Sequence, residues 1–393
     1  MRHFHQLDEA AVERLFSQPP KEFARDADTD TLAVALGATL YMPATRPTLA
    51  RDLARQGASG VMSSVVCLED AIADEDLPAA EENVVFQLRE LGARRGSLLS
   101  DDTLPLLFVR VRNADQIGAV VSGLGEHADL LSGFVLPKFT DQSGAEFLDA
   151  LGDARSFSGL PLRAMPVIES PEAIYRESRK DTLVGVQQLL AKDRDLVLAV
   201  RLGATDLSAA YGIRRDRDLT IYDVPLVAEV ITDVVNILGR ADGTGYVVTG
   251  PVWEYFANHD RIFKPQLRQS PFEDHDATTL RHRLITRDLD GLIREIVLDK
   301  ANGLTGKTVI HPTHVAAVHA LSVVTHEEYA DACDILGADM SGGGVRASSY
   351  RNKMNEAKPH RAWALRTARR AAVFGVAGAD VSFVDLLLAG VEL

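Results

Sequence analysis

Residues 60–92 show a strand followed by a helix and read GVMSSVVCLEDAIADEDLPAAEENVVFQLRELG. Residues 60–70 are a short apolar run that ends in two adjacent carboxylates, Glu69 and Asp70. Residues 76–92 then space their apolar side chains as an amphipathic helix does. An apolar run followed by such a helix is typical of a strand buried on both faces of a parallel sheet.

The same alternation continues along much of the chain. Eight strands are predicted, over residues 33–43, 60–70, 104–113, 130–138, 162–170, 195–206, 245–250 and 306–312. Strands that alternate with helices predict an α/β protein with a parallel sheet, and eight strands are the number that closes a (β/α)₈ TIM barrel. A doubly wound open sheet is the alternative that this pattern leaves open.

The alternation predicts three parts. We expect residues 1–32 to form an N-terminal arm, residues 33–320 the catalytic barrel, and residues 321–393 a C-terminal helical extension. Residues 341–352, rich in Gly, Ser and Arg, favour a linker over a phosphate-binding loop. Asp380 and Asp385 interrupt the apolar C-terminal residues, which therefore predict a packed helix rather than a membrane span.

Composition limits the possible partners. The 393 residues carry a net charge of −14, and this excess of acid argues against a nucleic-acid surface. It does not exclude a small anionic substrate. The two cysteines, Cys67 and Cys333, form no disulfide framework, and residues 1–10 contain no apolar core of a signal peptide. We therefore expect a cytoplasmic protein.

Ionisable side chains occur at the ends of seven predicted strands. They are Arg46; Glu69 and Asp70; Arg110 and Arg112; Lys138; Glu169; Asp206; and His311. Reactive groups of a (β/α)₈ barrel gather at the C-terminal ends of its strands. Each of these residues alone could be a helix cap or a solvated side chain. Acid and base at so many strand ends together favour a functional site.

The residue types indicate the chemistry of that site. Carboxylate oxygens without a cluster of histidine or cysteine suit Mg²⁺ or Mn²⁺ better than zinc. Guanidinium groups match the geometry of a substrate carboxylate. A divalent cation beside a small anionic substrate is therefore predicted.

At these residues the sequence resembles the superfamily of citrate lyase beta subunits and HpcH/HpaI aldolases, which also includes malyl-CoA lyase. Seven motifs carry the resemblance in order: YMPATRP (41–47), CLEDAI (67–72), VRVRN (109–113), VLPK (135–138), PVIES (166–170), LGATDLSAAYG (202–212) and GKTVIHPTHV (306–315). The likeness covers about residues 35–335 and is to a divergent, longer branch. It implies a magnesium-dependent carbon–carbon lyase or aldolase built on a TIM barrel.

The resemblance and the residue chemistry together give expected roles. They are Glu169 and Asp206 for the metal; Glu69, Asp70 and Arg110 for catalysis; and Arg46, Arg110, Arg112 and Lys138 for substrate binding. His311 can either support the barrel mouth or act on the substrate. The resemblance also implies a homo-oligomer, a trimer or a hexamer.

The expected substrate is a small 2-oxo or 2-hydroxy carboxylic acid, free, phosphorylated or as an acyl-CoA thioester. Ala44, Thr45 and Cys67 depart from the family pattern, which points to a changed substrate. Two other readings stay open: a phosphoenolpyruvate-type mutase or lyase, and a non-catalytic barrel that serves as a binding or scaffold subunit in a stress (tellurite) resistance system. Neither nucleic acid nor a membrane is an expected partner.

Overall fold

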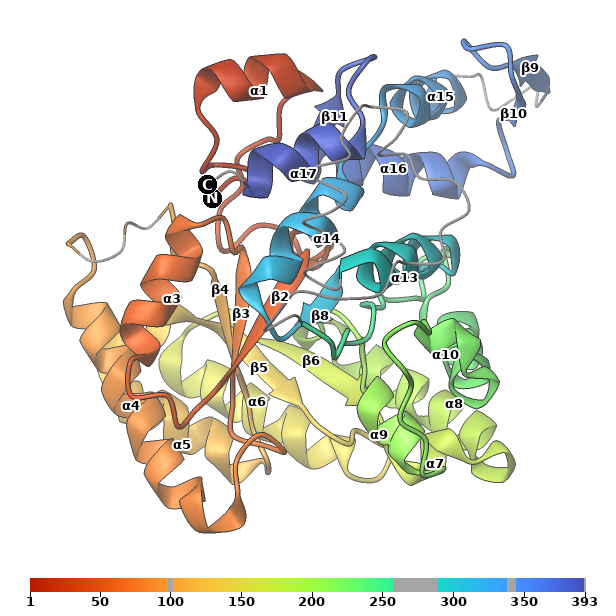
Figure 1. Cartoon of the computed structure of the whole chain (residues 1–393). Coiled ribbons are helices and arrows are strands. Elements are labelled where there is room, and N and C mark those ends of the chain that lie inside the picture. Colours follow the sequence, from red (N-terminus) through yellow and green to blue (C-terminus); the bar gives the residue numbers. More distant parts are fainter. Residues whose placement is uncertain (98–99, 101, 257–288, 338–343, 392–393) are drawn as a thin grey trace.

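The computed structural model describes residues 1–97, 100, 102–256, 289–337 and 344–391, and within them seven parallel strands form one curled sheet (Figure 1). The strands are β2 (Ala38–Pro43), β3 (Ser63–Cys67), β4 (Leu106–Arg110), β5 (Leu131–Leu136), β6 (Arg163–Ile168), β7 (Arg201–Leu202) and β8 (Lys307–Val309). Their order across the sheet is β7-β6-β5-β4-β3-β2-β8. Because every neighbouring pair is parallel, all C-terminal strand ends lie at one end of the sheet.

Residues 247–250 join the two outer strands and close the sheet into a barrel. Val248 pairs in parallel with Val200, next to β7, and Gly250 pairs in parallel with Lys307 of β8. The predicted (β/α)₈ barrel is therefore confirmed. The strand predicted over residues 245–250 is therefore present only as two single β-bridges and is shorter than predicted.

Helices cover the outer face of the barrel. They are α3 (Leu49–Ala58), α4 (Leu77–Ala93), α5 (Asp115–Leu124), α6 (Gly144–Ser158), α7 (Pro171–Ile174), α8 (Arg176–Lys192), α9 (Ala204–Ala209), α10 (Pro225–Leu238), α13 (Leu289–Ala301) and α14 (Val315–Ser322). Side chains of each strand alternate between helices and barrel interior. Leu107 and Val109 belong to the outer core, for example, whereas Phe108 lies in the inner one. Burial on both faces explains the apolar runs of the sequence.

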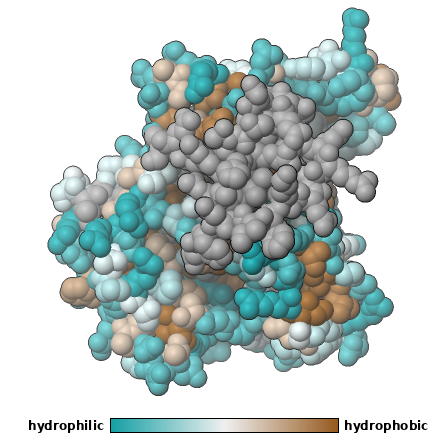
Figure 2. Space-filling view, viewed as in Figure 1, coloured by the Kyte–Doolittle hydropathy of each residue, from teal (hydrophilic) through white to brown (hydrophobic). Residues whose placement is uncertain are grey.

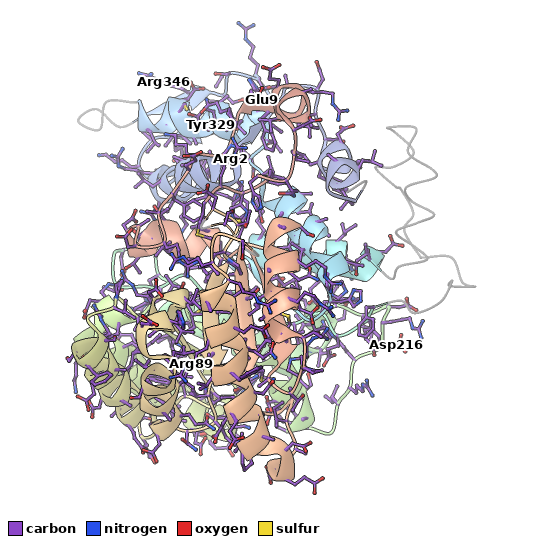
Figure 3. The ribbon with its side chains drawn as sticks, turned by 90° about the vertical axis from the view of Figure 1, so that its left-hand side faces the viewer. Arg2, Glu9, Arg89, Asp216, Tyr329 and Arg346 are labelled. Atoms are coloured by element: carbon purple, nitrogen blue, oxygen red, sulfur yellow. The ribbon has the colours of Figure 1, made fainter. Side chains whose placement is uncertain are left out.

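The two ends of the chain lie together in a terminal module, defined as residues 1–36, 324–337 and 344–391 (Figure 1). It contains α1 (Glu9–Leu15), β1 (Phe16–Gln18), α2 (Thr29–Ala35), α15 (His326–Leu336), β9 (Val345–Ala347), β10 (Met354–Glu356), α16 (Arg361–Phe374), β11 (Val376–Ala377) and α17 (Phe383–Val391). Strand β1 pairs with β11 in an antiparallel manner. Figure 3 shows Arg2, Glu9, Tyr329 and Arg346 together in this module.

The terminal module covers the end of the barrel where the strands begin. Leu32 and Leu36 share the inner core with Phe108. His3 bonds through Nε2 to the carbonyl oxygen of Ala35 at 3.0 Å. The opposite end of the barrel, where the strands finish, is the end that carries the predicted site residues.

The strand predicted over residues 33–43 is wrong in its first part. Asp28 caps α2 by accepting a hydrogen bond from the amide of Thr31 at 2.9 Å, and this helix continues to Ala35. Gly37 then has a φ of +52°, which favours glycine. A Cβ at Gly37 would lie 2.9 Å from Nε2 of His319, so the turn also lacks room for a side chain.

The predicted linker, residues 341–352, contains strand β9, which pairs in an antiparallel manner with β10 beyond it, while residues 341–343 lie outside the described residues. The apolar C-terminal segment forms helix α17 as predicted. No helix in the described ranges combines the length and the apolar character that crossing a membrane requires. Where Figure 2 shows the described surface, hydrophilic residues predominate and apolar residues form small separate patches.

Candidate active site

Four predicted site residues meet at the C-terminal ends of four neighbouring strands. Glu69 follows β3, Arg110 ends β4, Lys138 follows β5 and Glu169 follows β6. Because these strands are adjacent and parallel, their ends lie side by side at the barrel mouth. We call these four residues, with Asp70 and Asp206, the mouth cluster.

Arg110 is at the centre of the mouth cluster. Its Nη2 lies 2.8 Å from Oε2 of Glu69 and 2.8 Å from Oε1 of Glu169. Its Nε is buried and has no hydrogen-bond partner among the described residues. Burial alone would lower the pKa of Arg110, but the neighbouring carboxylates, above all Glu169, outweigh burial and raise it. Arg110 is therefore a fixed positive charge.

Glu169 is a deeply buried acid, with only 2% of its surface exposed. Its Oε1 accepts hydrogen bonds from Arg110 and, at 3.0 Å, from the backbone amide of Lys138. Its Oε2 packs against Gly203, where a Cβ would lie 2.0 Å away. Burial, and then the charge of Asp206, raise the pKa of Glu169 to about 7 despite Arg110. A carboxylate in this state favours an additional cation nearby.

Lys138 joins the carboxylates on either side of it. Its Nζ lies 2.5 Å from Oε1 of Glu69 and 3.1 Å from Oδ1 of Asp70. Burial alone would lower the pKa of Lys138, but the hydrogen bonds to these two acids raise it. Its backbone has a φ of +47°, a left-handed conformation that a lysine rarely adopts. Such strain is often found at functional sites, where it holds a side chain in place.

The two adjacent acids of the opening stretch differ in environment. Glu69 is buried, and burial raises its pKa. Asp70 is half exposed, and although burial acts in the same direction there, contacts with Glu69 and Lys138 lower its pKa. The amide of Asp70 also donates to Oε2 of Glu69 at 2.7 Å. The pair therefore offers one acid that holds a proton more readily and one that stays ionised.

Asp206 lies in the first turn of α9, directly after β7. Its charge contributes to the raised pKa of Glu169, so the two carboxylates act on one another. The mouth cluster thus has four acids and two bases. With all six groups ionised, the cluster carries two surplus negative charges, which a divalent cation would compensate.

The donor set of the mouth cluster fits Mg²⁺. Its acids supply only oxygen, and the described part of the chain contains no group of three or more His, Cys, Asp or Glu side chains that could hold a metal ion. Mg²⁺ commonly takes one or two carboxylates and keeps water or substrate oxygens in its other positions. Glu169 and Asp206 match that requirement.

Two predicted substrate-binding arginines have other partners. Nη2 of Arg46 lies 2.7 Å from Oδ2 of Asp52, at the start of α3. Nη1 of Arg112 lies 2.5 Å from Oδ1 of Asp74, and its Nη2 donates to the carbonyl oxygen of Ile72. In this structure both side chains brace loops at the barrel mouth.

His311 stands at the end of β8. Its ring stacks on Phe256 with the centroids 4.8 Å apart, and its Nδ1 bonds to the hydroxyl of Thr313 at 2.8 Å. Burial lowers the pKa of His311. These contacts hold the ring of His311 against the loop that contains Phe256.

A polar group inside the barrel, formed around Arg201 of β7, is not among the predicted site residues. Arg201 is 1% exposed, donates to the hydroxyls of Thr39 and Thr308, and lies over the ring of Tyr41 at 5.4 Å. No carboxylate among the described residues forms an ion pair with it. The sequence does mark this residue, because Arg201 is the charged side chain that interrupts the apolar run of residues 196–202.

Solved structures of other proteins share this fold. Protein CitE from Mycobacterium tuberculosis, in complex with magnesium, acetoacetate and coenzyme A, is 21% identical, with a TM-score of 0.54 over 86% of this chain and 99% of that chain. A citrate lyase from Burkholderia xenovorans LB400 is 17% identical, with a TM-score of 0.60 over 89% and 96%. Malate synthase from Haloferax volcanii is 13% identical, with a TM-score of 0.51 over 76% and 75%.

No curated protein matches the chain. A family model does match, over residues 30–376, and it describes the C-C bond lyases of the TIM-barrel fold. The match spans most of the barrel and reaches into the terminal module. The chain therefore belongs to the family of C-C bond lyases with a TIM-barrel fold.

Proposed function

We propose that this protein is a Mg²⁺-dependent carbon–carbon lyase that acts on a small 2-oxo or 2-hydroxy carboxylic acid or on its acyl-CoA thioester. One observation carries the proposal: Arg110 is held between Glu69 and Glu169 in a barrel mouth with two surplus negative charges. Such a mouth suits a divalent cation together with a carboxylate substrate. The magnesium and acetoacetate of the CitE structure support the same reading.

Glu169 and Asp206 would hold the metal, with Mn²⁺ as a substitute. A bound divalent cation would stabilise the negative charge that develops when a bond next to a carbonyl breaks. The hydrogen bonds to Oε1 of Glu169 fix the orientation of that carboxylate, and the lack of a side chain at Gly203 makes room for Oε2. The chain therefore supplies a ligand that is oriented before the metal binds.

Arg110 and Lys138 would bind the carboxylate of the substrate. Arg110 contacts both buried glutamates through Nη2 alone, so the other edge of its guanidinium is the part that can face a ligand. The side chain of Lys138 is half exposed and provides a second cation at the mouth. Arg46 and Arg112 would shape the mouth from their braced loops.

Glu69 and Asp70 would carry out proton transfer to the substrate. Burial raises the pKa of Glu69, so its carboxyl holds a proton more readily than an ordinary glutamate does. Lys138 bridges the two acids and keeps them close together. A proton carried on Glu69 can then be delivered to a carbon or oxygen atom beside Arg110.

A substrate panel tests the activity. Free 2-hydroxy acids and their CoA thioesters are incubated with the protein and Mg²⁺, and released pyruvate, glyoxylate or acetyl-CoA is measured. We expect release from at least one member, and loss of release in EDTA. Comparison of acids with thioesters identifies the substrate class. If no member of the panel releases product although Mg²⁺ binds tightly, the lyase proposal is contradicted.

Metal binding is tested separately by calorimetry. Glu169→Gln and Asp206→Asn should each weaken Mg²⁺ binding by at least about tenfold, because each removes a charged ligand. The matched control is Glu229→Gln, which removes a half-exposed acid paired with Arg176 on the outer helices. Full Mg²⁺ affinity in both site variants would refute the ligand assignment.

A further inference from the structure

The inner face of β2 carries a tyrosine that the roles proposed above do not use. Thr39 and Tyr41 are two residues apart on this strand, so both side chains point into the barrel, where Tyr41 packs against the inner core. Thr39 is 1% exposed, whereas Tyr41, nearer the C-terminal end of the strand, is partly exposed. Because the layer that contains Thr39 is buried, the exposed part of Tyr41 lies toward the barrel mouth.

The charges around Tyr41 place its hydroxyl close to the mouth cluster. Burial raises the pKa of Tyr41, although Arg201 and then Arg110 act in the opposite direction. Cys67, which ends β3, and Glu169, which follows β6, raise the same pKa further. Such interactions weaken with distance, so the hydroxyl lies near the residues at the ends of three strands. The phenol keeps its proton and is therefore a hydrogen-bond donor at this place.

Arg201 supports Tyr41 from inside the barrel. Its guanidinium lies over the ring of Tyr41 at 5.4 Å and is held there by hydrogen bonds to the hydroxyls of Thr39 and Thr308. Burial lowers the pKa of Arg201, and its interaction with Tyr41 acts against this. A guanidinium has donors and no acceptor, so Arg201 cannot take the hydrogen of the Tyr41 hydroxyl. Within the described part of the chain no acceptor takes that hydrogen, which a ligand at the mouth could therefore use.

We propose that the hydroxyl of Tyr41 donates a hydrogen bond to the oxygen on the second carbon of the substrate, and that Arg201 is the positioning residue that holds Tyr41 for this contact. The inference rests on the proposed function and narrows its substrate class to acids with an oxygen on that carbon. The carboxylate of such an acid would lie on Arg110 and Lys138. A donor that faces the second oxygen selects against an acid that lacks it, because the donor is then left without a partner.

The charge of Arg201 explains why this donor suits an oxygen that carries partial negative charge. Arg201 is 1% exposed, and its Nε has no hydrogen-bond partner in the described ranges. Its only partners there are neutral: two threonine hydroxyls, a methionine sulfur and the tyrosine. A positive charge that no acid balances draws electron density from the phenol and strengthens its O–H as a donor.

Pyruvate and propionate are suitable probes, and their binding to the full chain with Mg²⁺ is measured by calorimetry. The two acids have the same carbon chain, but propionate lacks the oxygen on the second carbon. Tyr41→Phe should weaken pyruvate binding by about three- to tenfold and leave propionate binding unchanged. The matched control is Tyr246→Phe, because Tyr246 also lies against an arginine, Arg194, but belongs to the outer core. It should change neither affinity.

The role of Arg201 is tested by the ratio of the two affinities. Arg201→Met should weaken pyruvate binding more than propionate binding. Because both residues act through one hydroxyl, Tyr41→Phe combined with Arg201→Met should lose little more pyruvate affinity than the weaker of the two single variants. A merely structural Arg201 would weaken the binding of both acids equally or add its loss to that of Tyr41→Phe, and either result would overturn its assignment.

The outcomes separate this inference from the lyase proposal. Unchanged pyruvate affinity in Tyr41→Phe, or an equal loss for both acids, would overturn the assignment of Tyr41 and leave the lyase proposal as it stands. No binding of pyruvate by the unaltered protein would also overturn the inference. Product release in the substrate panel decides the lyase proposal independently of both results.

Discussion

Two clusters of charged side chains in this barrel differ in the balance between the number of acids and the number of bases. The mouth cluster has four acids, two bases and a buried Nε on Arg110 without a partner among the described residues. A second group lies between β8, α13 and residues 215–223; we call it the closed cluster, and it consists of Arg215, Glu295, Asp299 and Lys307. Glu254 stands at its rim, 3.5 Å from Arg215.

In the closed cluster each buried acid faces a buried base. Lys307 lies 2.8 Å from Glu295 and 2.7 Å from Asp299, and Arg215 pairs with Glu295. Further hydrogen bonds come from the hydroxyl of Tyr222 to Asp299 and from the amide of Ile221 to Glu295. Both acids are thus paired and hydrogen-bonded by the chain itself, although Nε of Arg215, like Nε of Arg110, has no hydrogen-bond partner among the described residues. The closed cluster therefore joins strand to helix, whereas the mouth cluster leaves charge for a ligand.

The difference gives a way to distinguish structural from functional charge. Both clusters are buried, both contain raised carboxyl pKa values, and Asp299 reaches about 6 while Glu169 reaches about 7. Burial and pKa alone would not separate them. The balance of acids against bases does separate them.

The largest expected effect is on stability in the closed cluster. Lys307→Met leaves Glu295 and Asp299 buried with less compensation, and we expect a loss of about 3–5 kcal/mol in the free energy of unfolding. Urea denaturation measures it. The control Lys300→Met removes a partly exposed pair with Glu328 and should cost at most about 1 kcal/mol. Equal losses in both variants would show that the closed cluster is not structural.

The second effect is on activity at the mouth. Arg110→Met should lower kcat/KM by about 10²–10³-fold, corresponding to about 2.7–4 kcal/mol of lost transition-state stabilisation. Its acidic neighbours can take up protons, so we expect a smaller stability loss than for Lys307→Met. Arg112→Met is the matched control two residues beyond the same strand, since that residue pairs with Asp74. A larger loss of kcat/KM in Arg112→Met would reverse the assignment.

The third effect is on how the stability of the protein depends on pH. In metal-free protein the pKa of Glu169 is about 7, above its ordinary value of 4.5, so the folded chain holds more protons between these values. Stability should therefore fall as pH rises through this range. Glu169→Gln removes this loss and should be more stable by about 2–3 kcal/mol above pH 7 in EDTA. Parallel stability curves of variant and unaltered protein from pH 4.5 to 8 would contradict this.

The smallest effect concerns the backbone of Lys138, with its φ of +47°. Lys138→Gly and Lys138→Ala both remove the amine, but only glycine tolerates this φ freely. We expect the glycine variant to be more stable than the alanine variant by about 1 kcal/mol in thermal or urea unfolding. Both should lose activity to the same extent. Equal stability would show that the mouth does not hold Lys138 in a strained conformation.

Much of the barrel could be predicted from the sequence because buried parallel strands are continuous apolar runs. The boundary at residues 33–43 could not, because Ala33–Ala35 are apolar in a helix as well as in a strand, and the cap at Asp28 precedes them. Most predicted site residues follow strands, which a linear pattern can locate. The partners of Arg46 and Arg112 depend on loop geometry, which the pattern does not contain.

The pairing of β1 with β11 sets the order in which the chain can be completed. The hydroxyl of Ser17 donates to the carbonyl oxygen of Ala377, 360 residues away in sequence. A nascent chain must therefore keep β1 unpaired until β11 has been synthesised. Truncations that remove β11 should leave Leu15 and Phe16 exposed and prone to aggregation.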